Sequence, residues 1–251
     1  MDLKLKNKKV LISGSSKGIG LSIAKKFIKE GAKVVINSRN KYDLNAVALS
    51  IGNCHSVAED VSIPAGAMNA TIRAAEMLGG IDILVCNVGS GSSVPPGHES
   101  YNEWQRVFSV NFFTATNLIE ASLKYLARSQ GSVVCISSIC GAERIPGAPV
   151  TYSVAKSALN TYVKSIAAPL AERGIRINSV APGNINFDGS IWSEKMAQDA
   201  DSVQEMLQND VPLRKLGSPD DVAGLVVWLA SDVSNFVTGT VMTTDGGQSR
   251  S

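Results

Sequence analysis

The chain has 251 residues, of which 44% are hydrophobic and 18% charged, and its formal net charge at pH 7 is +2. This composition is that of an ordinary globular domain with one large core, and the small net charge gives no reason to expect binding to nucleic acid or to a membrane. No apolar run reaches the length of a membrane span, and the N-terminus lacks a signal-peptide pattern, so we expect a cytoplasmic protein.

Strands alternate with helices along the whole chain. Short apolar runs predict strands at 10–13, 33–37, 55–58, 81–86, 132–136, 175–180 and 240–244. Helical spacing predicts helices at 19–30, 42–50, 65–78, 101–108, 111–126, 152–174 and 220–230. Pro169 should kink the last turn of its helix. This alternation predicts an α/β fold, a single Rossmann-like domain over 1–251 with a doubly wound parallel sheet of about seven strands. The polar, loosely helical stretch 184–216 is expected to be a lid over the substrate.

Four cysteines and two histidines leave little material for a metal site. Cys54, Cys86, Cys135 and Cys140 form no Cys-x-x-Cys pair, and three of them lie in or at the end of apolar, strand-like runs. We therefore expect free, buried thiols in a reducing compartment, with no disulfide framework and no metal.

Three glycines stand between the first strand and the first helix. The spacing Gly14-x-x-x-Gly18-x-Gly20 lets the backbone turn tightly and approach a diphosphate, which would meet the N–H groups that open the next helix. An ordinary glycine-rich turn would give the same pattern. The setting between a strand and a helix favours a dinucleotide site.

The end of the second strand usually distinguishes NAD from NADP. An acidic residue there binds the ribose 2′-hydroxyl of NAD, whereas an arginine accommodates the 2′-phosphate of NADP. Ser38 and Arg39 occupy this junction without a carboxylate, and Lys17 in the glycine loop offers a second cation. The sequence therefore favours NADP(H) over NAD(H), although an arginine after a strand is often only a solvated charge.

Polar or glycine-containing segments follow the later strands as well. Asp60 could accept a hydrogen bond from an adenine amino group or could simply flank a helix. Asn111 lies among apolar residues, where its amide must find partners, and it could be a structural plug or hold a water. Because ligands on such sheets bind outside the carboxyl ends of the strands, further candidates are the residues at these ends: Val61, Asn87, Val88, Gly89, Ser138, Pro182 and Gly183.

Tyr152 and Lys156 are four residues apart, so both project from one face of the predicted helix. A phenol has an unperturbed pKa of about 10, and a neighbouring ammonium should lower it. The pair would then act as a general acid/base on an alcohol or a carbonyl, with the Ser138 hydroxyl binding the substrate oxygen. Taken alone, the pair also fits an ordinary helix with a half-buried tyrosine and a solvated lysine.

Together these motifs resemble the short-chain dehydrogenase/reductase family over essentially the full length, and most closely its 3-oxoacyl carrier-protein reductase-like and sugar or polyol dehydrogenase-like members. The resemblance implies hydride transfer between a nicotinamide and a ketone or secondary alcohol, with no metal. It implies that Tyr152 exchanges the proton, Ser138 binds the substrate oxygen, Lys156 lowers the pKa of Tyr152 and binds the nicotinamide ribose, and Asn111 positions a water. It also implies a homodimer or homotetramer, and it adds Ser16, Ile19 and Ile185 to the cofactor-binding residues.

The chain departs from the family pattern at two places. Phe187 stands where many members have a threonine that binds the nicotinamide carboxamide, so Asn186 or a main-chain group would take over, or the nicotinamide would be bound more loosely. The segment from Ser138 to Tyr152 is one residue longer than usual, and Arg144 within it could pair with an anionic substrate or lie on the surface. Substrate class stays open between an acyl chain and a sugar. An NAD(H)-dependent alcohol, polyol or sugar dehydrogenase and a catalytically idle dinucleotide-binding scaffold remain alternatives.

Overall fold

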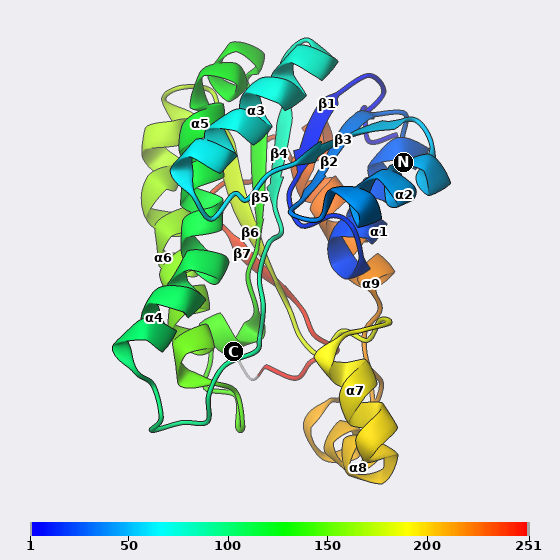
Figure 1. Cartoon of the computed structure of the whole chain (residues 1–251), viewed down its shortest axis with the longest axis vertical. Helices are drawn as coiled ribbons and strands as arrows, with labels where there is room; N and C mark the ends of the chain where they lie inside the picture. The colour runs from blue at the N-terminus through cyan, green and yellow to red at the C-terminus, as the bar shows by residue number, and fades with distance from the viewer. Residues whose placement is uncertain (1, 250–251) are drawn as a thin grey trace.

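A sheet of seven parallel strands lies at the centre of the computed structural model, which describes residues 2–249 (Figure 1). The strand order is β3-β2-β1-β4-β5-β6-β7. This confirms the predicted doubly wound parallel fold; residues 1, 250 and 251 of the predicted domain lie outside the described residues. The strands are β1 (Lys9–Ile12), β2 (Lys33–Ser38), β3 (Cys54–Ala58), β4 (Ile83–Cys86), β5 (Ser132–Ile136), β6 (Arg176–Pro182) and β7 (Val241–Thr244).

Helices cover both faces of the sheet, as a parallel sheet requires (Figure 1). One core cluster includes Leu11, Ala70, Leu118, Leu159 and Ile177 and packs under α3, α5 and α6. The other face carries α1, α2 and α9 over a second core cluster. The helices are α1 (Gly18–Lys29), α2 (Lys41–Ile51), α3 (Pro64–Leu78), α4 (Tyr101–Phe108), α5 (Thr114–Ser129), α6 (Val150–Ala171), α7 (Ile191–Gln198), α8 (Ala200–Asp210) and α9 (Pro219–Ala230).

Local sequence signals fix several helix ends. The Asn40 side chain accepts hydrogen bonds from the first turn of α2, and Ser218 and Asp221 form a capping box that opens α9. Gly79 ends α3 in the left-handed conformation that a glycine adopts without strain. These caps explain why the element boundaries follow the sequence closely.

Several element boundaries differ in detail from the sequence expectation. The fourth strand begins at Ile83 rather than at residue 81, and α6 begins at Val150 and continues through Pro169 to Ala171. The two helical stretches expected at 101–108 and 111–126 are joined by a π-helical turn, Ser109–Phe113, which sequence periodicity does not reveal. The four cysteines are free thiols; Cys86 and Cys135 are buried, and Cys54 and Cys140 are half-buried.

The strand order reverses between β1 and β4, because the chain builds β1 to β3 outward and then returns to the centre. At such a switch point the loops after the two neighbouring strands run in opposite directions and leave a crevice for a ligand. The carboxyl ends of the strands face the lower side of Figure 1, where the loop before α4 and the helices α7 and α8 also lie.

The stretch expected to be a lid forms α7 and α8, which project from the body of the molecule (Figure 1). Val203, Leu207 and Val211 form a small core of their own, packed against partly buried Trp192, Met206 and Leu216. The two ends of this stretch meet at a parallel bridge between Ile185 and Gly217. We refer to residues 184–216 as the lid.

Candidate active site

The glycine loop turns into the N-terminus of α1. Gly14 and Gly18 have φ values of +61° and +55°, which glycine adopts more readily than other residues. The N-cap side chain makes no capping hydrogen bond, and no acidic residue lies in the first turn of this helix. Such a helix end favours an anion. Ser16 is half-buried and Lys17 exposed in the loop, while Ile19 packs partly against the core.

Asn87 ties the end of β4 to the glycine loop. Its side-chain Nδ2 donates to the main-chain oxygens of Ser13 and Gly14 at 3.2 and 2.8 Å, and its main-chain N–H donates to Ser13 Oγ at 3.1 Å. A Cβ on Gly14 would lie 3.1 Å from Val88 Cγ2. The two loops of the switch point are therefore packed directly against each other.

The end of β2 presents Arg39 beside Asp60. Arg39 is 78% exposed, and its NH1 lies 4.0 Å from Asp60 Oδ2. Asp60 Oδ1 accepts hydrogen bonds from both the N–H and the hydroxyl of Ser62, which together with Arg39 hold the pKa of this carboxyl below its usual value although burial opposes the shift. Asp60 thus serves as a helix-flanking turn residue and as a partner for the arginine.

Three of the expected cofactor residues have side chains that are buried or hydrogen-bonded within the chain. Val61 is buried in the core, so that only its main chain remains for contact, and Ser38 Oγ donates to the Asn40 carbonyl at 3.3 Å. The side chain of Ile185 is also buried. The hydrogen bonds of its bridge to Gly217 are made by the neighbouring residues Asn184 and Asn186.

Asn111 occupies the π-helical turn and fastens the loop after β4. Its Oδ1 accepts from the Ser90 N–H at 2.9 Å, and its Nδ2 donates to the carbonyls of Ser90 and Val107, each at 3.1 Å. The amide is thus engaged within the protein. This favours a structural role for Asn111 over the role of holding a water. A Cβ on Gly89 would lie 3.1 Å from Asn111 Oδ1 and 2.9 Å from Lys156 Nζ, so the loop also touches the catalytic candidate on α6.

Tyr152 and Lys156 occupy the first turns of α6, beside the end of β5. Lys156 is only 2% exposed, and its Nζ donates to the Ile136 carbonyl at 2.8 Å and lies 6.0 Å from the centre of the Tyr152 ring. Ser138 hydrogen-bonds the Tyr152 side chain, and its Oγ accepts from the Cys140 N–H at 3.2 Å. The three predicted residues therefore converge on one point at the carboxyl edge of the sheet.

The electrostatics of this group differ from the sequence expectation. Burial raises the pKa of Tyr152 to about 12, and the hydrogen bond with Ser138 only partly opposes this rise. Burial lowers the pKa of Lys156 to about 8. The expectation that Lys156 lowers the pKa of Tyr152 is therefore wrong for the chain by itself. The loss of hydration on burial has the larger effect on this pKa, and the Lys156 ammonium is hydrogen-bonded to the main chain.

A polar network beside Tyr152 was not found from the sequence. Ser93 Oγ lies 2.7 Å from Glu103 Oε1 and 2.6 Å from Oγ1 of the fully buried Thr151. Arg106 donates to both Glu103 oxygens, at 2.7 and 2.8 Å, and to the Ser92 carbonyl. Ser100 caps α4 by accepting from the Glu103 N–H, while the Glu103 side chain bonds to Ser93 and Arg106.

The loop after β6 leads into the lid. Gly183 donates to the Thr244 carbonyl at 3.0 Å, and a Cβ there would lie 2.7 Å from Asp245 Cβ, so the Pro182-Gly183 turn needs its glycine. Asn186 is exposed, and its Oδ1 accepts weakly from Ser190 at 3.4 Å. The Phe187 ring lies against Gly18 of the glycine loop.

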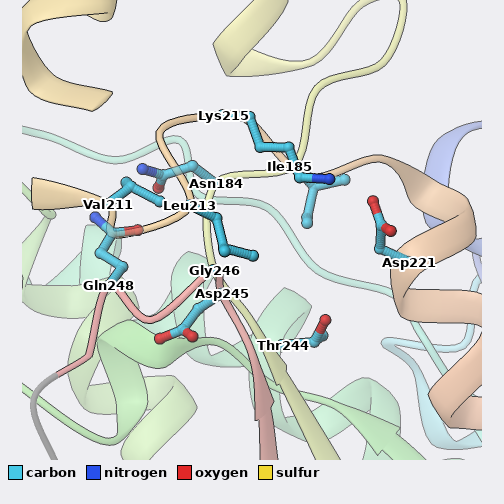
Figure 2. A pocket seen from close by; sticks show the side chains of 11 residues that line it. Asn184, Ile185, Val211, Leu213, Lys215, Asp221, Thr244, Asp245, Gly246 and Gln248 are labelled. Atoms are coloured by element: carbon cyan, nitrogen blue, oxygen red, sulfur yellow. The ribbon is translucent and has the colours of Figure 1, made fainter. Parts of the chain in front are cut away.

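Two cavities flank the site without including its catalytic candidates. Figure 2 shows one of about 110 Å³ at the base of the lid, with Asn184 and Ile185 on one side, Val211, Leu213 and Lys215 on the returning segment, and Asp245 and Gln248 near the end of β7. The other, of about 470 Å³, lies between residues 140–148 and the outer side of α6, and the exposed Arg144 lines it.

A search of residues 2–249 finds no group of three or more His, Cys, Asp or Glu side chains that could hold a metal ion. Over the same residues, none of the helices combines the length and the apolar character needed to cross a membrane.

The residues present fit a nicotinamide dinucleotide. The glycines leave the backbone of the first loop bare at an uncapped helix N-terminus, as a diphosphate requires. Lys156 is a buried ammonium with one main-chain acceptor, and among residues 2–249 no carboxylate forms an ion pair with it. It therefore has N–H donors left for ribose hydroxyls. Fold and site together define a dinucleotide-dependent oxidoreductase.

The comparisons with known proteins agree. Residues 14–249 match a family model described as enoyl-(acyl carrier protein) reductase. A glucose 1-dehydrogenase of Bacillus subtilis is 34% identical, covering 97% of this chain and 95% of its own, and a 3-oxoacyl-[acyl-carrier-protein] reductase of Aquifex aeolicus is 33% identical, covering 98% and 99%. The chain belongs to the short-chain dehydrogenase/reductase family and is an oxidoreductase acting on alcohol or ketone groups.

Solved structures of similar proteins contain both cofactors. The L-sorbose reductase of Gluconobacter frateurii, complexed with NADPH and L-sorbose, superposes with a TM-score of 0.93 at 29% identity and full coverage of both chains. A 7α-hydroxysteroid dehydrogenase complexed with NADH and a 7-oxo bile acid has a TM-score of 0.90 at 27% identity, covering 100% of this chain and 97% of its own. A nicotinamide cofactor is thus supported, whereas the choice between its two forms rests on this chain's own residues.

Proposed function

We propose that this protein interconverts a ketone and a secondary alcohol with NADP(H), using Tyr152 as the general acid/base. The observation that carries the proposal is the convergence of Ser138, Tyr152, Lys156 and Gly89 at the carboxyl ends of β4 and β5, beside the glycine loop. When bound, the nicotinamide supplies or accepts the hydride. The residues of the chain bind and orient the cofactor and the substrate, and they exchange the proton.

In reduction, Ser138 donates a hydrogen bond to the carbonyl oxygen and the Tyr152 hydroxyl delivers the proton. A pKa of about 12 keeps this hydroxyl protonated at neutral pH, as a proton donor must be. Lys156 binds the ribose hydroxyls and, as the ammonium, favours the phenolate that forms. In oxidation the same groups act in reverse, and the Tyr152 phenolate accepts the proton of the alcohol. Asn111 acts by fixing the loop that carries Gly89.

The cofactor residues follow from the same arrangement. Gly14, Ser16, Gly18, Ile19 and Gly20 would contact the diphosphate and its flanking riboses at the start of α1. The 2′-phosphate of NADP would be bound by Arg39, Ser38 and Lys17. The remaining contacts would come from the strand ends: the adenine from Asp60 and the main chain of Val61, and the nicotinamide half from Asn87, Val88, Gly89, Pro182, Gly183 and Ile185.

Replacing Tyr152 by phenylalanine tests the mechanism. Removing the proton donor should lower turnover by about 10³-fold, and NADPH affinity should stay almost unchanged because the ring remains in place. Tyr162→Phe is the matched control, since Tyr162 lies half-buried on the same helix and packs against the core. Normal turnover by the Tyr152→Phe variant would contradict the mechanism.

The cofactor preference is tested by titrating NADPH and NADH in parallel into the wild type and Arg39→Ala. Loss of a charge-assisted contact to the 2′-phosphate should weaken NADPH binding by about tenfold or more and leave NADH binding unchanged. Stronger binding of NADH by the wild type would favour the NAD(H)-dependent alternative. Binding of neither dinucleotide would favour the idle scaffold.

Two substrate classes remain within this proposal. Similarity to a glucose dehydrogenase and a sorbose reductase supports a hydroxylated substrate, and similarity to a 3-oxoacyl reductase supports an acyl one. Two serine hydroxyls of the loop after β4 are already engaged within the chain: the Ser90 hydroxyl accepts from the Ser92 N–H, and the Ser93 hydroxyl bonds to Glu103 and Thr151. Initial rates with a keto-sugar and with a 3-oxoacyl thioester would separate the classes.

We also propose a homodimer or homotetramer. Phe113, Val150 and Val154 are exposed apolar side chains around α5 and α6, and Phe236 is fully exposed just before the edge strand β7. Such side chains are typical of surfaces that pair with a second copy. Light scattering coupled to size exclusion would give the oligomeric state; a monomer at micromolar concentration would contradict the proposal.

A further inference from the structure

The Phe187 ring lies directly on the backbone of Gly18. A Cβ placed on Gly18 would be 2.5 Å from Cε2, 2.6 Å from Cζ and 2.9 Å from Cδ2 of this ring. Only a residue without a side chain permits such an approach. The contact joins the first residue of α1 to the first segment of the lid, two parts of the chain far apart in sequence.

The main chain around Phe187 is fixed to α7. The Phe187 N–H donates to Ser190 Oγ at 3.2 Å, and the Ser190 N–H donates to the Phe187 carbonyl at 2.9 Å. Ser190 is buried and caps α7, because its Oγ also accepts from the Ser193 N–H at 3.0 Å. The ring therefore moves with the first lid helix, and its contact with Gly18 sets the position of that helix.

The glycine loop meets the lid at a second point, where a Cβ on Gly189 would lie 3.6 Å from Lys17 Nζ. The two ends of the lid are joined next to Phe187 in the chain, and we call this pairing the hinge. Asn186 N donates to the Gly217 carbonyl at 2.8 Å, and Gly217 N donates to the Asn184 carbonyl at 2.9 Å. The cavity of about 110 Å³ shown in Figure 2 adjoins this hinge and leaves room for the segments to shift.

The surface that the ring covers is the one a diphosphate would use. Gly18 opens α1, whose first N–H groups have neither a side-chain cap nor an acidic neighbour. An anion binds there by close approach to the backbone, and glycine is needed for that approach. An aromatic ring on the same face of Gly18 excludes other groups from it, because carbon atoms cannot come closer than van der Waals contact.

We propose that Phe187 couples the lid to cofactor binding: its ring packs on Gly18 before the dinucleotide binds and leaves Gly18 when the diphosphate enters. This inference rests on the proposed dinucleotide-dependent function. It makes Phe187 a positioning residue. Its ring contacts the glycine loop before the dinucleotide binds, and α7 is free to move once the ring has left Gly18. Removing the ring should therefore ease cofactor entry.

The test measures NADPH binding by stopped-flow fluorescence in the wild type, Phe187→Ala and Met196→Ala. Met196 is a matched control, because it is a partly exposed apolar residue of α7, the helix that follows Phe187. Loss of an aromatic contact that binding would otherwise have to break should raise the association rate constant by about fivefold in Phe187→Ala. Met196→Ala should behave as the wild type.

Hydrogen exchange of residues 186–198 without cofactor gives a second readout. Exchange should be faster in Phe187→Ala than in the wild type or in Met196→Ala, because the lid has lost its contact with the glycine loop. Slower association or faster NADPH dissociation in Phe187→Ala would overturn the inference, since it would mean that the ring packs on the bound cofactor. Unchanged kinetics and exchange would overturn it as well. Binding of neither dinucleotide by the wild type would instead contradict the proposed function.

Discussion

Two segments at the carboxyl edge of the sheet are fastened in different ways. The β4–α4 loop, residues 87–100, is tied by directional hydrogen bonds: Ser90 to Asn111, and Ser93 to Glu103 and Thr151. The lid has main-chain hydrogen bonds near its two ends, and between them it rests on apolar contacts, namely its own small core and the Phe187 ring on Gly18.

The two segments touch where a Cβ on Gly91 would lie 3.1 Å from Ile191 Cδ1. Hydrogen bonds fix orientation, whereas apolar contact is non-directional and can be remade after a shift. We therefore expect the β4–α4 loop, which forms the wall beside Tyr152, to stay in place, and the lid, which forms the opposite wall, to move.

The largest expected effect comes from removing the hydrogen bonds that hold the β4–α4 loop in place. Glu103→Ala removes the carboxylate that Ser93 and Arg106 share, so the loop and Thr151, the neighbour of Tyr152, lose their common anchor. Misplacing a catalytic group by about 1 Å can lower turnover by about 10²-fold, and we expect an effect between tenfold and that value. Steady-state kinetics and NADPH titration measure it.

The split between parameters distinguishes positioning from a general loss of structure. In Glu103→Ala kcat should fall while NADPH affinity stays the same, because the start of the loop, which would contact the cofactor, is held by Asn87 and Asn111 and not by Glu103. Thr151→Val, which keeps the side-chain shape, should show a smaller fall in the same parameter. A fall in NADPH affinity with kcat unchanged would show that the loop does not position Tyr152.

A smaller effect is expected from weakening the movable wall. Leu207 is buried in the small lid core, whereas Leu118 is buried in the main core. Leu118→Ala should lower the free energy of unfolding by about 3 kcal/mol, as deletions in a well-packed core do. Leu207→Ala should cost about half as much, because the lid can open locally without unfolding the sheet. Urea denaturation of both variants measures this difference.

The same lid variant should also change substrate binding. Because we expect the lid to close over the substrate, Leu207→Ala should raise KM by about fivefold and change kcat little. Equal losses of stability in the two leucine variants would show that the lid unfolds together with the sheet, and the comparison between the two walls would then fail.

The smallest effect concerns pH. The hydrogen bonds from Arg106 and Ser93 lower the pKa of Glu103 from 4.5 to about 2. A carboxyl with a lowered pKa contributes stability above its unfolded pKa, and this contribution is lost as the pH falls toward the folded value. The difference in Tm between wild type and Glu103→Gln should therefore be constant down to about pH 5 and shrink below about pH 4.5. Calorimetry measures it, and a difference that shrinks already near neutral pH would contradict the network.

Most of the fold could be predicted because its signals are local. The parallel strands are buried and read as short apolar runs, and glycine or capping residues mark helix ends such as Gly79 and Ser218. The π-helical turn at Asn111 could not be predicted, since its sequence has ordinary helical spacing. Helix α6, in contrast, was expected to continue past Pro169, and it does so to Ala171.

The candidate site was predictable as far as its residues follow strand ends. Topology brings Gly14, Asn87 and Ser138 to one edge, and their positions in the chain already imply it. The raised pKa of Tyr152 was not predictable, because it depends on how deeply the hydroxyl is buried. The Ser93–Glu103–Thr151 network and the Phe187 contact join residues distant in sequence, so no local pattern announces them.

The bridge between Ile185 and Gly217 has an evolutionary consequence. Because the lid leaves the fold and returns to it at adjoining points, its length and sequence can change without moving any strand of the sheet. The segment between these two residues can therefore be exchanged as a unit. Grafting the corresponding segment of a relative onto this bridge should transfer that relative's choice of substrate while Ser138, Tyr152 and Lys156 stay where they are.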